Sequence, residues 1–169
     1  MKSCLVVALL AVLPAWAAKP HEHGVARVDV GVEARRLSVF LEMPLDSAVG
    51  FEREPRTDAE RQQAQAALAR LNDGAALWRI DPAAGCTLAK ANVEAGPLAP
   101  GAAPAKEGHD DLDASYEFTC TDAAKAGFVE VGLFDAFARL QRVEVQAVTR
   151  KGQLKATLKR PTSRLPLAR

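Results

Sequence analysis

The chain has 169 residues, with 22 basic and 21 acidic side chains and a formal net charge of +1 at pH 7. A charge so close to zero argues against nucleic acid or an anionic membrane surface as the main partner. The length suits a single domain, and since only 5% of the residues are aromatic, its core must rely on valine, leucine and alanine.

The first 17 residues have the pattern of a secretory signal peptide. Lys2 gives the positive start, residues 5–13 form an apolar run, and Ala15-Trp16-Ala17 is a small-x-small cleavage site. The run is too short to span a membrane and no longer one follows, so we expect no stable membrane insertion. We predict a signal peptide over residues 1–17 and one exported, periplasmic domain over residues 18–169.

Two cysteines, Cys86 and Cys120, would remain after export. In an oxidising compartment a disulfide is their default state, and closing a loop of about 35 residues stabilises a fold by roughly 3–4 kcal/mol on the chain-entropy model. The alternative is a pair of thiolate metal ligands, but neither cysteine lies in a Cys-x-x-Cys motif or has a histidine nearby in the sequence. A disulfide is favoured.

The first half of the domain predicts a hairpin followed by a helix. Apolar residues alternate over 28–32 and 37–43, with a turn at 33–36. Thr57-Asp58-Ala59-Glu60 is a capping box, which opens a helix that should run to about Leu71. Residues 49–55 read as an irregular charged loop, in which Glu52 should face solvent or pair with a neighbouring arginine.

The second half predicts several short strands. They are expected at residues 77–80, 86–93, 109–120 and 128–134, followed by a helical turn at 135–140 and a hairpin over 143–158. The Pro/Ala/Gly composition near residues 95–108 predicts a flexible loop. The expected fold is α+β, a single domain with a mostly antiparallel β-sheet and one main helix.

The three histidines suggest a metal site. His21 and His23 form a His-x-His step, whose side chains share one face in an extended segment, and His109 precedes a predicted strand. Asp111 would share a face with His109 and could supply a carboxylate ligand. The alternative is that these residues belong to a solvated tail and a solvated loop.

The order of several landmarks resembles that of a known family, the ZrgA-type zinc-regulated periplasmic proteins. The landmarks are His21-x-His23-Gly24-x-Ala26, Gly50-Phe51-Glu52-x-x-Pro55, Gly85-Cys86, His109-x-Asp111-Leu112-x-Ala114-x-Tyr116-x-Phe118-x-Cys120, Leu133-Phe134 and Val145-Gln146. The resemblance implies a periplasmic zinc-binding protein that assists zinc acquisition beside an ABC-type zinc importer, and it implies no enzymatic activity.

The chain departs from this family at two places. Relatives commonly carry a histidine-rich tract between the cysteines, where this chain has Pro, Ala and Gly with only His109. Relatives also often have a histidine at the position of Arg53, and arginine does not bind metal ions. With these two departures, the resemblance implies either one defined metal site or no metal site.

Imidazole and carboxylate ligands suit zinc, although copper or nickel would also bind them. The sequence therefore predicts one zinc ion held by His21, His23, His109 and Asp111 or a water. Two other classes stay open. One is a zinc hydrolase or hydratase with an open coordination position, for which no general base stands out. The other is a metal-free interaction domain whose hairpin edges bind a partner.

Overall fold

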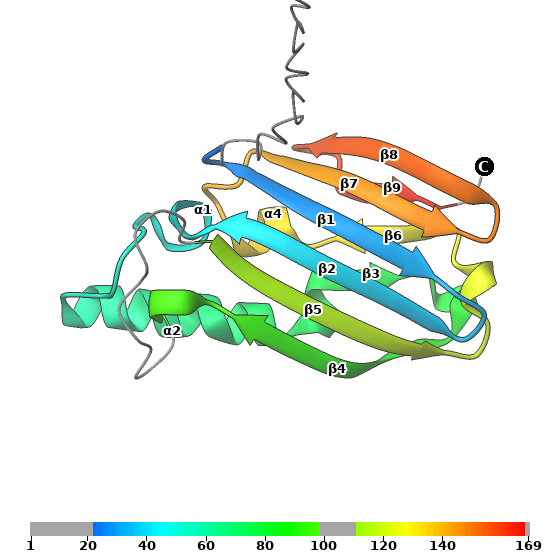
Figure 1. Ribbon diagram of the computed structural model, residues 1–169, viewed down its shortest axis with the longest axis horizontal. Helices are drawn as coiled ribbons and strands as arrows, with labels where there is room; N and C mark the ends of the chain where they lie inside the picture. The colour runs from blue at the N-terminus through cyan, green and yellow to red at the C-terminus, as the bar shows by residue number, and fades with distance from the viewer. Residues whose placement is uncertain (1–21, 99–110, 168–169) are drawn as a thin grey trace, which may run out of the picture.

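Two β-sheets face each other across the core in the structure, a computed structural model that describes residues 22–98 and 111–167 (Figure 1). The larger sheet has six strands in the order β4-β5-β2-β1-β7-β8, and the smaller has three in the order β3-β6-β9. Every pairing is antiparallel except that of β1 with β7. The fold is α+β with a mostly antiparallel sheet, as the sequence predicts.

The strands of the large sheet are β1 (Val25–Val32), β2 (Arg36–Pro44), β4 (Cys86–Glu94), β5 (Asp111–Cys120), β7 (Arg142–Thr149) and β8 (Gly152–Lys159). Those of the small sheet are β3 (Trp78–Ile80), β6 (Phe128–Val131) and β9 (Arg164–Pro166). The described helices are α1 (Leu45–Val49), α2 (Asp58–Asn72), α3 (Gly74–Leu77) and α4 (Leu133–Ala136), with 3₁₀ turns η1 (Pro82–Ala84), η2 (Gly96–Leu98) and η3 (Ala123–Lys125).

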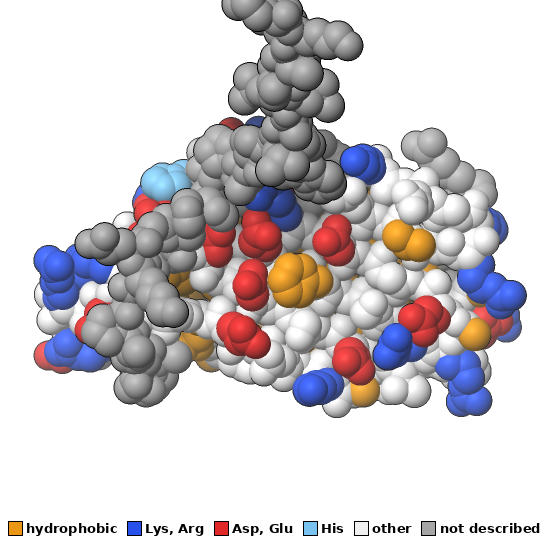
Figure 2. Space-filling view, in the orientation of Figure 1, with side chains coloured by type: hydrophobic (Ala, Val, Ile, Leu, Met, Phe, Trp, Pro, Cys, Tyr) orange, Lys and Arg blue, Asp and Glu red, His pale blue; other side chains and the backbone are white. Residues whose placement is uncertain are grey.

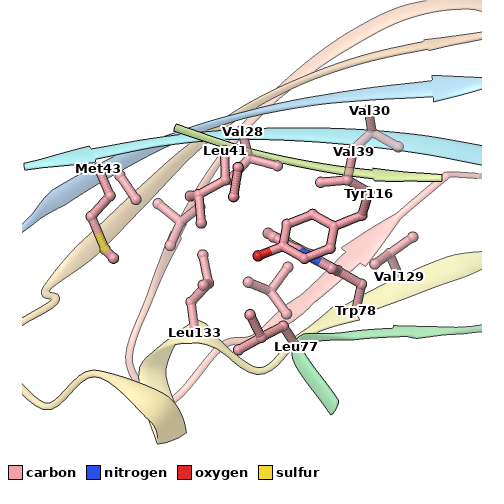
Figure 3. Packing of buried hydrophobic residues seen from close by; sticks show 14 of the residues in the cluster. Val28, Val30, Val39, Leu41, Met43, Leu77, Trp78, Tyr116, Val129 and Leu133 are labelled. Atoms are coloured by element: carbon pink, nitrogen blue, oxygen red, sulfur yellow. The ribbon is translucent and has the colours of Figure 1, made fainter. Parts of the chain in front are cut away.

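The core fills the space between the sheets (Figure 3). Alternate residues of β2 and β5 point inward and are buried, while the intervening residues, most of them polar, form the outer face of the large sheet. Tyr116 of β5 meets Trp78 of the small sheet with ring centroids 5.7 Å apart. The Tyr116 hydroxyl donates a 2.8 Å hydrogen bond to the Leu71 carbonyl, and burial raises the pKa of this phenol.

Helix α2 begins at the predicted capping box. The Thr57 hydroxyl accepts from the Glu60 amide at 3.2 Å, and the Glu60 carboxylate accepts from the Thr57 amide. The helix buries small residues, Ala64 and Ala67, together with Leu71, and it packs beside the edge strand β4. The small side chains let the helix lie close to the sheet edge.

Several local predictions differ from the structure. Helix α1 was not predicted, and the strand expected over 128–134 ends at Val131, after which α4 begins at Leu133. The loop predicted near residues 95–108 starts with η2, which buries Leu98, and its residues 99–108 lie outside the described part of the chain. The predicted signal peptide also lies outside it.

The predicted disulfide is confirmed. Cys86 and Cys120 are directly opposite each other on β4 and β5 and are joined by an S–S bond of 2.07 Å. This bond lies at the end of the large sheet that contains the β1–β2 turn. At the same end, the Cys120 amide donates a 2.8 Å hydrogen bond to the carbonyl of Arg35 in that turn.

Candidate metal-binding site

His23 lies in a turn that leads into β1. The Val25 amide donates to the Glu22 carbonyl at 3.1 Å, which closes the turn. The next residue, Gly24, donates its amide to the buried Ser47 hydroxyl of α1 at 2.9 Å. The backbone on both sides of His23 is therefore fixed to the body of the protein, although the imidazole itself is 62% exposed.

Gly24 explains why the His-x-His step is followed by glycine. Its φ is +77°, a conformation that L residues rarely adopt. A Cβ at this position would lie 3.3 Å from the Gln141 side chain and 3.4 Å from the Arg139 carbonyl. The Gly24 carbonyl in turn accepts from the amides of Gln141 and Arg142 at 2.8 and 3.0 Å. Glycine lets the chain pass this close to the segment before β7.

Two carboxylates lie beside the imidazole. His23 Nε2 is 3.0 Å from Glu52 Oε1, and Nδ1 is 3.9 Å from Asp46 Oδ2. Asp46 is the more buried of the two acids and is held in place by Arg139, whose guanidinium donates to both carboxylate oxygens at 3.0 Å and to the Asp46 carbonyl at 2.9 Å. The imidazole therefore has one carboxylate near each ring nitrogen.

The fold brings Glu52 to His23 through α1. This helix ends at Val49 and is capped by Gly50, whose φ of +81° turns the chain so that Phe51 and Glu52 follow at the same end of the sheet. The expectation that Glu52 faces solvent or pairs with a neighbouring arginine is thus incomplete, because its carboxylate contacts the imidazole. The Gly50-Phe51-Glu52 motif marks this segment in the sequence. The contact between Glu52 and His23, however, joins residues too far apart for hydrophobic periodicity to predict it.

A histidine with two carboxylates offers donors that zinc accepts. The contact at Nε2 puts Glu52 where it could share a metal ion with His23, whereas Asp46 could orient the ring from the Nδ1 side. Within residues 22–98 and 111–167, however, no group of three or more His, Cys, Asp or Glu side chains is arranged to hold a metal ion.

Asp111 lies at the same end of the sheet but is not joined to His23 in a ligand cluster. It is the first residue of β5 and pairs with Pro44, the last residue of β2. Strands β1 and β5 flank β2 and run in the same direction, so their first residues are about 10 Å apart at normal strand spacing. The other predicted ligands, His21 and His109, lie outside the described residues.

The sequence profile of the family described as "ZrgA family zinc uptake protein" matches residues 20–167 of the chain. The chain belongs to the ZrgA family. No individually curated protein matches it. Membership supports a role in zinc acquisition, and the family is one of uptake proteins rather than enzymes. In the described part of this ZrgA-family protein, no helix is long and apolar enough to cross a membrane.

Arg53, where a histidine would be expected in many ZrgA relatives, has a structural role here. Its guanidinium donates to both Glu60 carboxylate oxygens at 2.9 and 2.8 Å and lies 5.3 Å from the Phe51 ring centroid. This pairing and the Arg56 amide lower the pKa of Glu60 to about 2. Arg53 thus fastens the loop before α2 to the first turn of the helix.

Carboxylates continue from the site onto the outer face of the large sheet. Glu94, Asp113 and Glu42 are directly opposite one another on β4, β5 and β2. Partial burial raises the pKa of the Asp113 carboxyl, and the nearby charges of Glu42, Asp111 and Glu94 raise it further. In Figure 2 the acidic side chains gather on this face over the same strands.

Proposed function

We propose that the protein is a periplasmic zinc-binding protein that assists zinc acquisition beside an ABC-type importer. Membership of the ZrgA family supports the zinc role. The Cys86–Cys120 disulfide supports an oxidising compartment, because such bonds persist mainly in exported proteins. The predicted signal peptide agrees with this location.

The observation that carries the proposal is the contact between His23 and two carboxylates at the mature N-terminal end of the domain. Nε2 lies 3.0 Å from Glu52, and Arg139 fixes Asp46 near Nδ1. This end of the sheet also holds Asp111 at the start of β5, two residues after His109 in the sequence. We propose that His21, His23 and His109 bind one zinc ion, with Glu52, Asp111 or water completing the shell.

Calorimetric titration with zinc tests this site. His21→Ala, His23→Ala and His109→Ala should each weaken binding about tenfold or more, since each would remove a direct ligand, and the triple variant should bind no zinc. Because zinc binds the neutral imidazole, affinity should also fall between pH 7.5 and 5.5. A His109→Ala protein that binds as tightly as wild type would remove His109 from the site.

Glu52→Gln tests whether Glu52 is a zinc ligand or acts only as a negative charge near the histidine. We expect it to weaken zinc binding several-fold, because the amide is a poorer ligand. Glu33→Gln is the matched control, since Glu33 is also an exposed acid but pairs with Arg36 and lies at the β1–β2 turn, the opposite end of the sheet. Equal effects of the two substitutions would indicate only a long-range charge effect.

The role in the cell needs a separate test. Production of the protein should rise when a chelator makes zinc scarce, and deletion should slow growth only under zinc limitation. A deletion strain with an intact importer and no defect at any zinc level would contradict the accessory role, even if the purified protein binds zinc.

A further inference from the structure

All but one of the six phenylalanines of the chain are buried in the core, lie under an arginine guanidinium, or both. Phe118 and Phe137 are buried in the core. Three others lie under an arginine guanidinium, at 5.3 Å from the ring centroid for Phe51, 5.3 Å for Phe134 and 4.1 Å for Phe128. Phe40 is the exception. Its side chain is 42% exposed, and no arginine or lysine of the described residues stacks on its ring.

Carboxylates surround Phe40 on the outer face of the large sheet. In the strand register, Asp29 of β1 is directly opposite it, and Glu42 is two residues further along β2 on the same face. Asp113 and Glu117 occupy the diagonal positions on β5, on either side of Ser115. Diagonal neighbours on one face of a sheet are within reach of long side chains.

Arg27 is the one cation at these neighbouring positions, and it is already paired. Its guanidinium donates to Glu42 at 2.8 Å. Phe40, Asp29 and Glu42 line a groove of about 520 Å³ that extends over β7 and β8, and its lining also includes Glu144 and two cations, Arg27 and Lys155. Figure 2 shows hydrophobic surface on this face with acidic side chains beside it.

We propose that Phe40 and its carboxylates form a docking point for an arginine-bearing segment of a partner protein. A guanidinium over the ring would gain a cation–π contact, and its N–H groups would reach the adjacent carboxylates. The same pairing of arginine with phenylalanine is used three times within the fold. A second copy of this chain is a poorer occupant, because apposing two such faces would bring their carboxylates together.

Binding of defined peptides tests the proposal. The probes are Ac-Ser-Arg-Ser-Arg-Ser-NH₂ and matched peptides with lysine or glutamate in place of arginine, titrated into the whole mature protein and followed by amide NMR shifts. The arginine peptide should shift Phe40 and its neighbours Asp29 and Ser115 and should bind more tightly than the lysine peptide, while the glutamate peptide should not bind. Shifts spread over other surfaces would overturn the proposal.

Variants on this face provide a second test of the docking proposal. Phe40→Leu keeps an apolar side chain but removes the aromatic ring, so the arginine peptide should bind about three- to tenfold more weakly. Val148→Ser is the matched control, because Val148 is 54% exposed on the same face, on β7, where it is diagonal to Asp29 but not next to Phe40 or to Glu42, Asp113 and Glu117. Unchanged binding by Phe40→Leu would overturn the proposal and leave only diffuse charge attraction.

Two further measurements test for self-association and for independence from the zinc site. Sedimentation without peptide should show a monomer, and Phe40-dependent self-association would replace the partner with a second copy. The zinc affinities of Phe40→Leu and of the control Val148→Ser should match that of wild type, because neither residue contacts His23 or Glu52. The docking point and the zinc site can therefore fail independently.

Discussion

The two ends of the large sheet are held together by different kinds of interaction. At one end the Cys86–Cys120 disulfide joins β4 to β5, and the Thr121 amide donates to the Gly85 carbonyl at 3.1 Å. The other end has no such bond among the described residues, and there His23 contacts the carboxylates of Glu52 and Asp46. The disulfide at the first end does not titrate, whereas the contacts at the second end are made by side chains that can gain or lose protons.

Loss of the disulfide should have the largest effect on stability. The Cys86→Ala/Cys120→Ala double variant removes a link between residues 34 positions apart, and we expect the free energy of unfolding to fall by about 3–4 kcal/mol on the chain-entropy model. Urea unfolding measures this change. Zinc affinity of the folded variant should equal that of wild type, and a parallel loss of zinc affinity would show that the two ends are coupled.

Gly24→Ala should affect both stability and the candidate site. The positive φ should cost about 1–2 kcal/mol, and the new Cβ would press on Gln141 and the Arg139 carbonyl. Because His23 is the preceding residue, zinc binding should weaken as well. Gly96→Ala is the matched control, since Gly96 has a φ of +46° but nothing within 4 Å of a Cβ. The control should lose only the stability due to its positive φ and no zinc affinity.

The sequence predicts the disulfide end better than the histidine end. Two-residue alternation locates the β1–β2 and β7–β8 hairpins, and a count of cysteines identifies the disulfide. The parallel pairing of β1 with β7 is not predictable in this way, because it joins segments more than 100 residues apart. The contacts of His23 with Asp46 and Glu52 depend on that pairing and on helix α1, which has no clear periodic signal in five residues.

Thr57→Ala tests how firmly α2 is attached at the histidine end. The substitution removes the hydroxyl that accepts from the Glu60 amide, and we expect a loss of about 1 kcal/mol in the free energy of unfolding. Thr57→Ser keeps the hydroxyl and should be close to wild type. Thermal or urea unfolding of the three proteins decides the matter, and equal destabilisation by alanine and serine would mean that the methyl group, rather than the cap, is important.

Glu60→Gln should separate the two ends of the sheet by pH. Arg53 and the Arg56 amide lower the pKa of Glu60 to about 2, below its ordinary value of 4.5. A carboxylate with a lowered pKa in the folded state stabilises the fold above its ordinary pKa, and this contribution is lost as pH falls towards 2. Wild type should therefore be more stable than Glu60→Gln at pH 7, and the difference should shrink between about pH 4.5 and 2.

Urea unfolding of wild type and Glu60→Gln across this pH range measures the difference. Glu130→Gln is a suitable control, because Glu130 also pairs with arginines, Arg79 and Arg164, but lies in the small sheet and away from α2. Amide exchange should show the acid-dependent loosening at Arg56 and Thr57, whose amides bond to Glu60, and not beside Cys86 and Cys120, where the link does not titrate. Equal loosening at both sites would mean that acid weakens the whole domain, and the contrast between a fixed end and a responsive end would then be wrong.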